Sequence, residues 1–215
     1  TTQYGFFDMV TKYSIGDFHP PGYFILLWIW THIGGTGEVW VRLPSVGLGV
    51  LTVFLTYLFG KELFNKRVGL LGALFLAVGP LHVYYSQEAR MYVLAAFAVI
   101  ISSFFFWRLI SRWNKWNLAG YIISGVLVLY SDYVAYFIFL THAVYILLYE
   151  REKIKKFIIP VAVVVGASVP WFFVFPKQLA TGTAATASLP VWKDIVGGAG
   201  IKDLLLIPVK TFFGR

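Results

Sequence analysis

A small set of polar side chains borders the long apolar stretches of this chain and could take part in a reaction. The set combines cationic or protonatable groups with carboxylates, an amide and a hydroxyl: His19, Gln87, Glu88, Arg90, Tyr92 and Asp132. Cations hold phosphate groups, and carboxylates accept protons or bind metal ions. A charged residue at the centre of a bilayer costs about 2.5–3.5 kcal/mol on insertion scales, so ionisable residues near apolar segments are functional candidates. Their mixture suits a reaction on an anionic lipid headgroup at one face of a membrane.

Each candidate also has a purely structural interpretation. His19 precedes Pro20-Pro21 and could simply cap a helix. Glu88 and Arg90 have the spacing of a local ion pair that closes a turn. Asp132 could only mark the outer end of a hairpin.

Other polar and aromatic residues favour a structural role. Arg42, two residues after Trp40, is typical of an interfacial anchor. Asp8 and Asp17 are typical of solvated loop acids. Tyr84, Tyr85 and Tyr92 are typical of an aromatic belt at a membrane surface.

The amino-acid composition indicates whether the chain lies in water or in a membrane. Of the 215 residues, 59% are hydrophobic and only 13% are charged, whereas a soluble domain is about 25% charged. A soluble enzyme or a nucleic-acid-binding module is therefore excluded, and a polytopic membrane protein is predicted. The net charge of +8 comes from 18 basic and 10 acidic residues. Cysteine is absent, which excludes disulfides, thiol catalysis and cysteine-bound metals.

The basic residues lie between apolar stretches and predict the topology. The apolar stretches cover about 20–33, 41–60, 68–85, 92–109, 117–131, 134–149 and 157–175. Three short breaks, at 60–67, 108–115 and 150–156, hold many of the lysines and arginines. Short basic loops stay in the cytoplasm, so we expect the outer side to hold residues 1–40, 86–91, 131–133 and 176–215.

The stretch 20–33 does not fit this alternation as a span. It is short, begins after Pro20-Pro21 and ends at Gly34-Gly35, which are start and stop signals of a helix. We expect an amphipathic or partly re-entrant helix at the outer interface. The alternative is a true span with an inverted scheme, which places the basic loops outside. A tight hairpin is expected between 117–131 and 134–149.

The two ends of the chain differ from the middle. Thr181 to Ser188 consists of small residues and predicts a flexible linker, followed by a segment that contains Trp192. The chain begins Thr1-Thr2-Gln3 without Met and ends at Arg215 within an apolar pattern. We expect an internal part of a larger protein.

Three motifs carry a resemblance to a known family. They are Asp17-Phe18-His19-Pro20-Pro21-Gly22-Tyr23-Phe24, then Arg42-Leu43-Pro44-Ser45, then Pro80 to Tyr92, which includes Tyr84-Tyr85-Ser86-Gln87-Glu88-Ala89-Arg90-Met91-Tyr92. In this order and spacing they resemble the protein-mannosyltransferase-like glycosyltransferases of family 39, which have the GT-C membrane fold. Pro170-Trp171 is a weaker match further on.

The resemblance implies an inverting transfer of a sugar from a polyprenyl-phosphate donor at the outer membrane face. It implies that His19 and Arg90 bind the donor phosphate and that Glu88, Gln87 and Tyr92 are polar residues of the active site. Asp132 occupies a loop where relatives often have Thr-His. The family's acidic base would lie upstream of Thr1, so this segment alone is expected to be inactive. No cofactor is required by the pattern, and a divalent metal ion stays open.

Together these features predict an all-α, polytopic membrane helix bundle with an outer interfacial helix. Its parts are an extracytoplasmic loop with that helix (1–40), about six spans (41–175) and the start of an extracytoplasmic loop (176–215). The predicted partners are a polyprenyl-phosphate-linked sugar donor, a lipid, protein or glycan acceptor and membrane lipids, with no nucleic acid. A bacterial or archaeal plasma membrane is the expected location. The alternatives are a transporter or lipid flippase, which would place charges near the bilayer midplane, and a non-catalytic scaffold.

Overall fold

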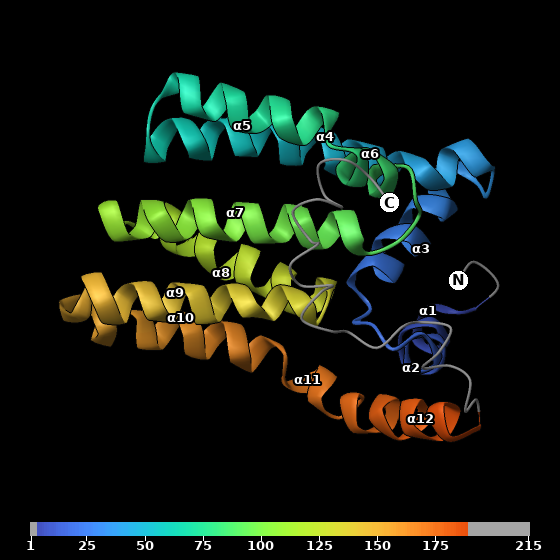
Figure 1. Cartoon of the computed structure of the whole chain (residues 1–215). Helices are drawn as coiled ribbons and strands as arrows, with labels where there is room; N and C mark the ends of the chain where they lie inside the picture. The colour runs from blue at the N-terminus through green and yellow to red at the C-terminus, as the bar shows by residue number, and fades with distance from the viewer. Residues whose placement is uncertain (1–3, 189–215) are drawn as a thin grey trace.

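The computed structural model describes residues 4–188, and the regular structure within that range is entirely helical (Figure 1). The elements in chain order are α1 (Phe6–Asp8), η1 (Met9–Tyr13), α2 (Ser14–Asp17), α3 (Gly22–Gly34), α4 (Glu38–Leu63), α5 (Lys66–Val78), α6 (Pro80–Ser86), α7 (Tyr92–Ser111), α8 (Lys115–Ser131), η2 (Val134–Tyr136), α9 (Phe137–Tyr149), η3 (Arg151–Lys153), α10 (Ile154–Ala167), α11 (Val169–Phe172) and α12 (Phe175–Ser188).

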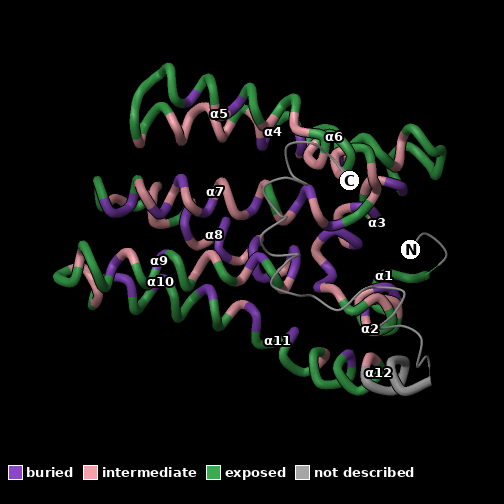
Figure 2. The backbone as a smooth tube through the Cα atoms, in the orientation of Figure 1, coloured by how far each residue is buried: buried purple, intermediate pink, exposed green. Residues whose placement is uncertain are grey.

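The long helices pack side by side into a bundle, as Figure 1 shows. α5 packs on α4, α4 on α7, α7 on α8, and α8 on α10. One core cluster joins Phe106, Tyr121, Ile146 and Phe157, which come from α7, α8, α9 and α10. The buried residues line the inner sides of these helices, whereas α5 and much of α12 are exposed (Figure 2). The predicted all-α membrane bundle is confirmed.

Two helices of the described range are individually long and apolar enough to cross a membrane, α4 and α7. Two further stretches pass the same test only as bent pairs. One is α5 with α6, bent by 63°, and the other joins 134–149 to 151–167 with a bend of 116°. Two to four spans are thus supported by length and composition, and a bundle of about six stays a prediction.

The three basic turns gather at one end of the bundle. Arg108 at the end of α7 forms an ion pair of 3.0 Å with Glu62 at the end of α4. Lys153 from the turn between α9 and α10 donates to the carbonyl of Ile110, with an Nζ–O distance of 3.1 Å. The turns are therefore in mutual contact, as the predicted alternation of helix directions requires.

Side-chain caps explain where two helices begin at that end. Asn65 accepts from the backbone N–H groups of Arg67 and Val68, and Asn114 accepts from those of Trp116 and Asn117. These bonds satisfy N–H groups that have no partner within the helix.

Two predicted spans are interrupted, which the hydropathy pattern did not show. The stretch 68–85 bends at Gly79, because Pro80 has no N–H to continue the helix and restricts the residue before it to an extended conformation. The stretch 157–175 ends as a continuous helix at Ala167, and Pro170 lies in the first turn of the separate helix α11.

The flexible linker predicted at 181–188 was wrong in its local structure. This segment belongs to α12, where alanines favour the helix and Thr181 donates to the carbonyl of Lys177. The segment that contains Trp192 lies outside the described residues.

The helix predicted at 20–33 is confirmed as α3. It starts after Pro20-Pro21 and ends at Gly35, which has a positive φ of 90°. α3 crosses the bundle at the end opposite the basic turns (Figure 1). It is held there by a 2.7 Å hydrogen bond between the hydroxyls of Tyr23 and Ser45. Its first residue, Gly22, lies against the end of α8, where an added Cβ would meet the carbonyl oxygen of Tyr130 at 2.3 Å.

Candidate functional site

His19 lies between two carboxylates that come from distant parts of the sequence. Its Nδ1 is 3.0 Å from Oδ2 of Asp17 and 2.6 Å from the backbone oxygen of the same residue. Its Nε2 is 4.0 Å from Oδ2 of Asp132. All three side chains are mostly buried, with exposed fractions of 27% for His19, 26% for Asp17 and 12% for Asp132.

Local backbone geometry places His19 in this position. Phe18, the residue before it, has a φ of 61° and is the single non-glycine residue with positive φ in the described range. This left-handed conformation ends α2 and turns the chain toward Pro20-Pro21. A left-handed residue with a side chain costs roughly 1–2 kcal/mol, so the surrounding contacts must hold it.

Asp132 shapes a turn with one carboxylate oxygen and faces His19 with the other, and its role in an active site stays a prediction. Its Oδ1 accepts from the backbone N–H of Val134 at 2.8 Å and so shapes the turn between α8 and η2. Its other oxygen, Oδ2, faces His19. The residue marks the end of the hairpin and also contributes to a polar cluster.

The two carboxylates favour the protonated form of His19. Burial opposes the imidazolium charge, but the hydrogen bonds and charge of Asp17, together with the charge of Asp132, outweigh it and raise the pKa of His19. His19 therefore carries its positive charge to a higher pH than an ordinary histidine does.

Arg90 lies in the turn between α6 and α7, on the same end of the bundle. A hydrogen bond with Tyr92 is the main cause that raises the pKa of Arg90, and the charges of Asp17 and Glu88 act in the same direction. The structure shows no ion pair between Glu88 and Arg90, so the interpretation of these two residues as a local ion pair that closes the turn is wrong. Asp17 thus interacts electrostatically with both predicted cations, His19 and Arg90.

A polar pocket of about 440 Å³ opens beside this turn. Its charged wall brings Glu88 and Arg90 together with two residues from the start of α4, Glu38 and Arg42. Arg42 donates to Oε1 of Glu38 at 2.7 Å, and half of its side chain is exposed. Two guanidinium groups and two carboxylates therefore line one cavity.

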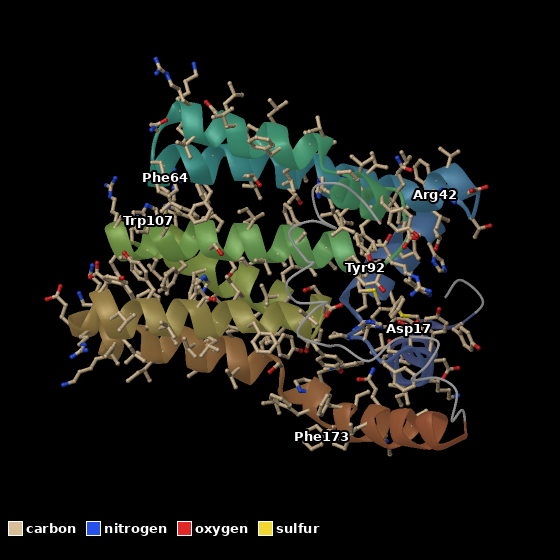
Figure 3. The ribbon with its side chains drawn as sticks, in the orientation of Figure 1. Asp17, Arg42, Phe64, Tyr92, Trp107 and Phe173 are labelled. Atoms are coloured by element: carbon tan, nitrogen blue, oxygen red, sulfur yellow. The ribbon has the colours of Figure 1, made fainter. Side chains whose placement is uncertain are left out.

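The other predicted site residues lie nearby. Gln87 lines the pocket of about 440 Å³ and is exposed. Tyr92 packs against Tyr85, with ring centroids 4.5 Å apart and the ring planes tilted by 49°. Figure 3 shows Asp17, Arg42 and Tyr92 at one end of the molecule, with Phe64 and Trp107 at the other.

Two residues of this region were given a structural role from the sequence, and a third was missed. Asp17 was interpreted as a solvated acid, yet it binds His19; the pair's spacing of two residues was the available signal. Arg42 was interpreted as an anchor, yet it lines the pocket of about 440 Å³. Gln178 of α12, only 3% exposed, bonds to the carbonyl of His19, and no local pattern marks it.

The side chain of Asp8 is half exposed to solvent, as predicted for a solvated acid, but Asp8 lies at the end of helix α1 and not in a loop. Its carboxylate pairs with Lys12 at 2.9 Å, and both side chains are half exposed or more. Among residues 4–188, no group of three or more His, Cys, Asp or Glu side chains is arranged to hold a metal ion.

Comparison with models of known protein families gives a match. Residues 18–173, more than half of the chain, match the family described as dolichyl-phosphate-mannose-protein mannosyltransferase. No curated protein and no solved structure matches the chain. The matched range contains His19, Arg42, Arg90 and Asp132 and ends before Gln178.

Proposed function

Because the chain belongs to the dolichyl-phosphate-mannose-protein mannosyltransferase family, we propose that it takes part in moving a sugar from a polyprenyl-phosphate donor to an acceptor. The family consists of membrane glycosyltransferases of the mannosyltransferase type. The sugar is mannose-like or another hexose or pentose, and the acceptor is a lipid, a protein or a glycan. The reaction takes place on the outer side, at the end of the bundle that holds His19 and Arg90.

The observation that carries this proposal is the cationic set at one end of the bundle. His19, Arg90 and Arg42 come from three separate segments. A guanidinium or imidazolium group binds phosphate through charge-assisted hydrogen bonds. We assign the donor phosphate to His19 and Arg90, and we add Arg42, which lines the same pocket as Arg90, as a third cation at this end of the bundle.

The chemistry of the transfer explains why cations are needed. A nucleophile of the acceptor attacks the anomeric carbon of the sugar, and the bond from that carbon to the phosphate oxygen breaks with inversion. The electron pair remains on the leaving lipid phosphate, so its negative charge grows during the step. Donors placed where charge develops lower the barrier, which is the role proposed for His19 and Arg90.

The carboxylates are assigned to positioning. Asp17 and Asp132 hold His19 from two sides, and Glu88 lines the pocket beside Arg90, where it can orient Arg90 or meet the acceptor. The resemblance to the family assigns removal of the acceptor's proton to an acidic residue outside this cluster. The lipid chain of the donor would lie between the helices.

A transfer assay on the full-length protein in lipid nanodiscs tests the proposal. The substrate is a polyprenyl-phosphate-linked mannose with a radiolabelled sugar, and a membrane extract supplies acceptors. Incorporation of label into acceptor, with release of polyprenyl phosphate, supports transfer. Movement of a fluorescent donor lipid across proteoliposomes without incorporation would overturn the proposal in favour of a flippase.

A further inference from the structure

Gln178 joins three segments of the site region through one buried side chain. Its Nε2 donates to the carbonyl of Ser14 at 2.5 Å and to the carbonyl of His19 at 3.1 Å. Its Oε1 accepts from the hydroxyl of Tyr133. The amide uses both its donor and acceptor groups, and only 3% of the residue is exposed.

The chain of hydrogen bonds continues beyond Gln178. Trp171 of α11 donates its indole N–H to the hydroxyl of Tyr133 at 2.9 Å. Tyr133 directly follows Asp132, and Phe18 of the His19 segment packs beneath α12, where an added Cβ on Gly182 would meet the Phe18 ring at 3.3 Å. The bonds therefore connect the backbone of His19 to the residue beside Asp132.

We propose that Gln178 is a positioning residue of the active site, and that its amide holds the His19 segment and the Asp132 turn together so that the imidazole stays beside the Asp132 carboxylate. The inference rests on the proposed function for its role in transfer. It extends the site into α12, beyond the residues that match the family.

An amide suits this position better than other side chains of similar length. The partners of Nε2 are two carbonyl oxygens, which require N–H donors, and the partner of Oε1 is a hydroxyl. Glutamate would place an acceptor against the two carbonyls. Methionine has similar length but removes the N–H donors from the two carbonyls and the acceptor from the Tyr133 hydroxyl, which keeps only its bond from Trp171, so the two segments would lose their connection.

Loss of the connection through Gln178 would change the protonation of His19. The charged groups that act on it are Asp17 from α2 and Asp132 from the turn after α8, while Arg90 acts on Asp17. From α12 the neutral Gln178 faces this region, and its neighbour Lys177 is exposed. If the Asp132 turn moves away, His19 loses one of its two stabilising carboxylates and releases its proton at lower pH.

The test measures the titration of His19 by NMR in the full chain, with histidine labelled at Cε1 and the protein in nanodiscs. The His19 signal is assigned by its loss in His19→Gln. Gln178→Met is expected to lower the His19 midpoint by at most about one pH unit, the lower end of the effect of a neighbouring opposite charge, because Asp132 acts more weakly on His19 than Asp17 does. Thr181→Val, one turn further along α12 and exposed, is the matched control with an unchanged midpoint.

A second variant reaches the same connection from the other side. Tyr133→Phe removes the hydroxyl that links Gln178 to Trp171, and it should lower the midpoint in the same direction. The double variant should add little to either single change, because both act through one connection. If Gln178→Met does not fold, Tyr133→Phe alone decides the question.

The outcomes separate this inference from the proposed function. A midpoint that stays at the wild-type value in the folded variants would overturn the role of Gln178. A lowered midpoint supports it, and the same variants should then lose transfer at a lower pH than wild type. A lowered midpoint in a protein that transfers no sugar would keep the connection and reject the transferase function.

Discussion

The two ends of the bundle use charge in different ways. At the basic end, cations lie on short turns between consecutive helices, and the turns are shaped by Asn65 and Asn114 acting on their own neighbours in sequence. At the opposite end, cations and carboxylates come from segments as distant as His19 and Asp132. Charges from separate segments also pair at the basic end, as Arg108 and Glu62 do. We interpret the excess of positive charge there as a signal of orientation, and the histidine held between two carboxylates at the opposite end as part of a site.

Replacement of one arginine at each end gives the largest expected contrast. Arg90→Ala should lower the rate of sugar transfer about 100-fold, the loss typical of removing one donor to a developing charge. Arg112→Ala, an exposed cation at the basic end, should leave the rate almost unchanged. Initial rates with the radiolabelled donor measure both. Equal losses would erase the distinction between the two ends.

The pH dependence of transfer tests the interaction between His19 and Asp132. The pKa of His19 is raised in the folded protein, so its charge is complete at low pH and is lost as pH rises through that raised value. Transfer should decline over the same range. Asp132→Asn keeps an oxygen for the N–H of Val134 but removes the negative charge, so the decline should begin at lower pH.

The loss of the Asp132 charge in Asp132→Asn sets how far the decline in transfer moves along the pH scale. A downward shift of one unit corresponds to about tenfold less protonated His19 at a pH above both values. Rates measured across the pH range for wild type and Asp132→Asn give the shift directly. An identical profile in the two proteins would show that His19 does not govern the reaction.

A smaller effect is expected at Arg42, because half of its side chain is exposed and its charge is screened by solvent. Arg42→Ala should raise the KM for the donor about fivefold, which corresponds to about 1 kcal/mol. Glu38→Gln removes the negatively charged partner of Arg42 and leaves the positive charge of Arg42 in place, so it should not raise KM. A KM for Arg42→Ala equal to that of wild type would restore its interpretation as an anchor.

The smallest effect on transfer is expected from the caps at the basic end. Asn65→Ala and Asn114→Ala should each lower the free energy of unfolding by about 1 kcal/mol, the usual loss for an N-cap. Transfer by the folded protein should stay at the wild-type rate. Denaturant titration followed by circular dichroism measures the first quantity, and a marked loss of transfer would connect the two ends functionally.

The sequence predicted the parts of the fold that depend on neighbouring residues. Pro20-Pro21 and Gly35 mark α3 because they act on the backbone next to them. The bend at Gly79 and the helix break at Ser168 were missed because the apolar pattern continues through both prolines. A hydropathy pattern reports burial in lipid and carries no information on whether the helix is continuous.

The same limit applies to the site. His19, Arg90 and Asp132 were predicted because polar residues between apolar stretches are conspicuous. Their mutual distances depend on how α3 and α8 pack, which no short segment encodes. Gln178 was missed because a glutamine near the surface is ordinary, and its burial becomes visible only when α12 lies over Ser14 and His19.

The contact of Gly22 with α8 has a mechanical consequence. Main chain touches main chain there, with no room for a methyl group beside the Tyr130 carbonyl. The distance between the His19 segment and the Asp132 turn is therefore set by backbone atoms in van der Waals contact, and not by side chains that could change rotamer. The methyl group of an alanine at position 22 would force the two segments apart. The imidazole of His19 would then move away from the carboxylate of Asp132, although neither of these two residues is changed.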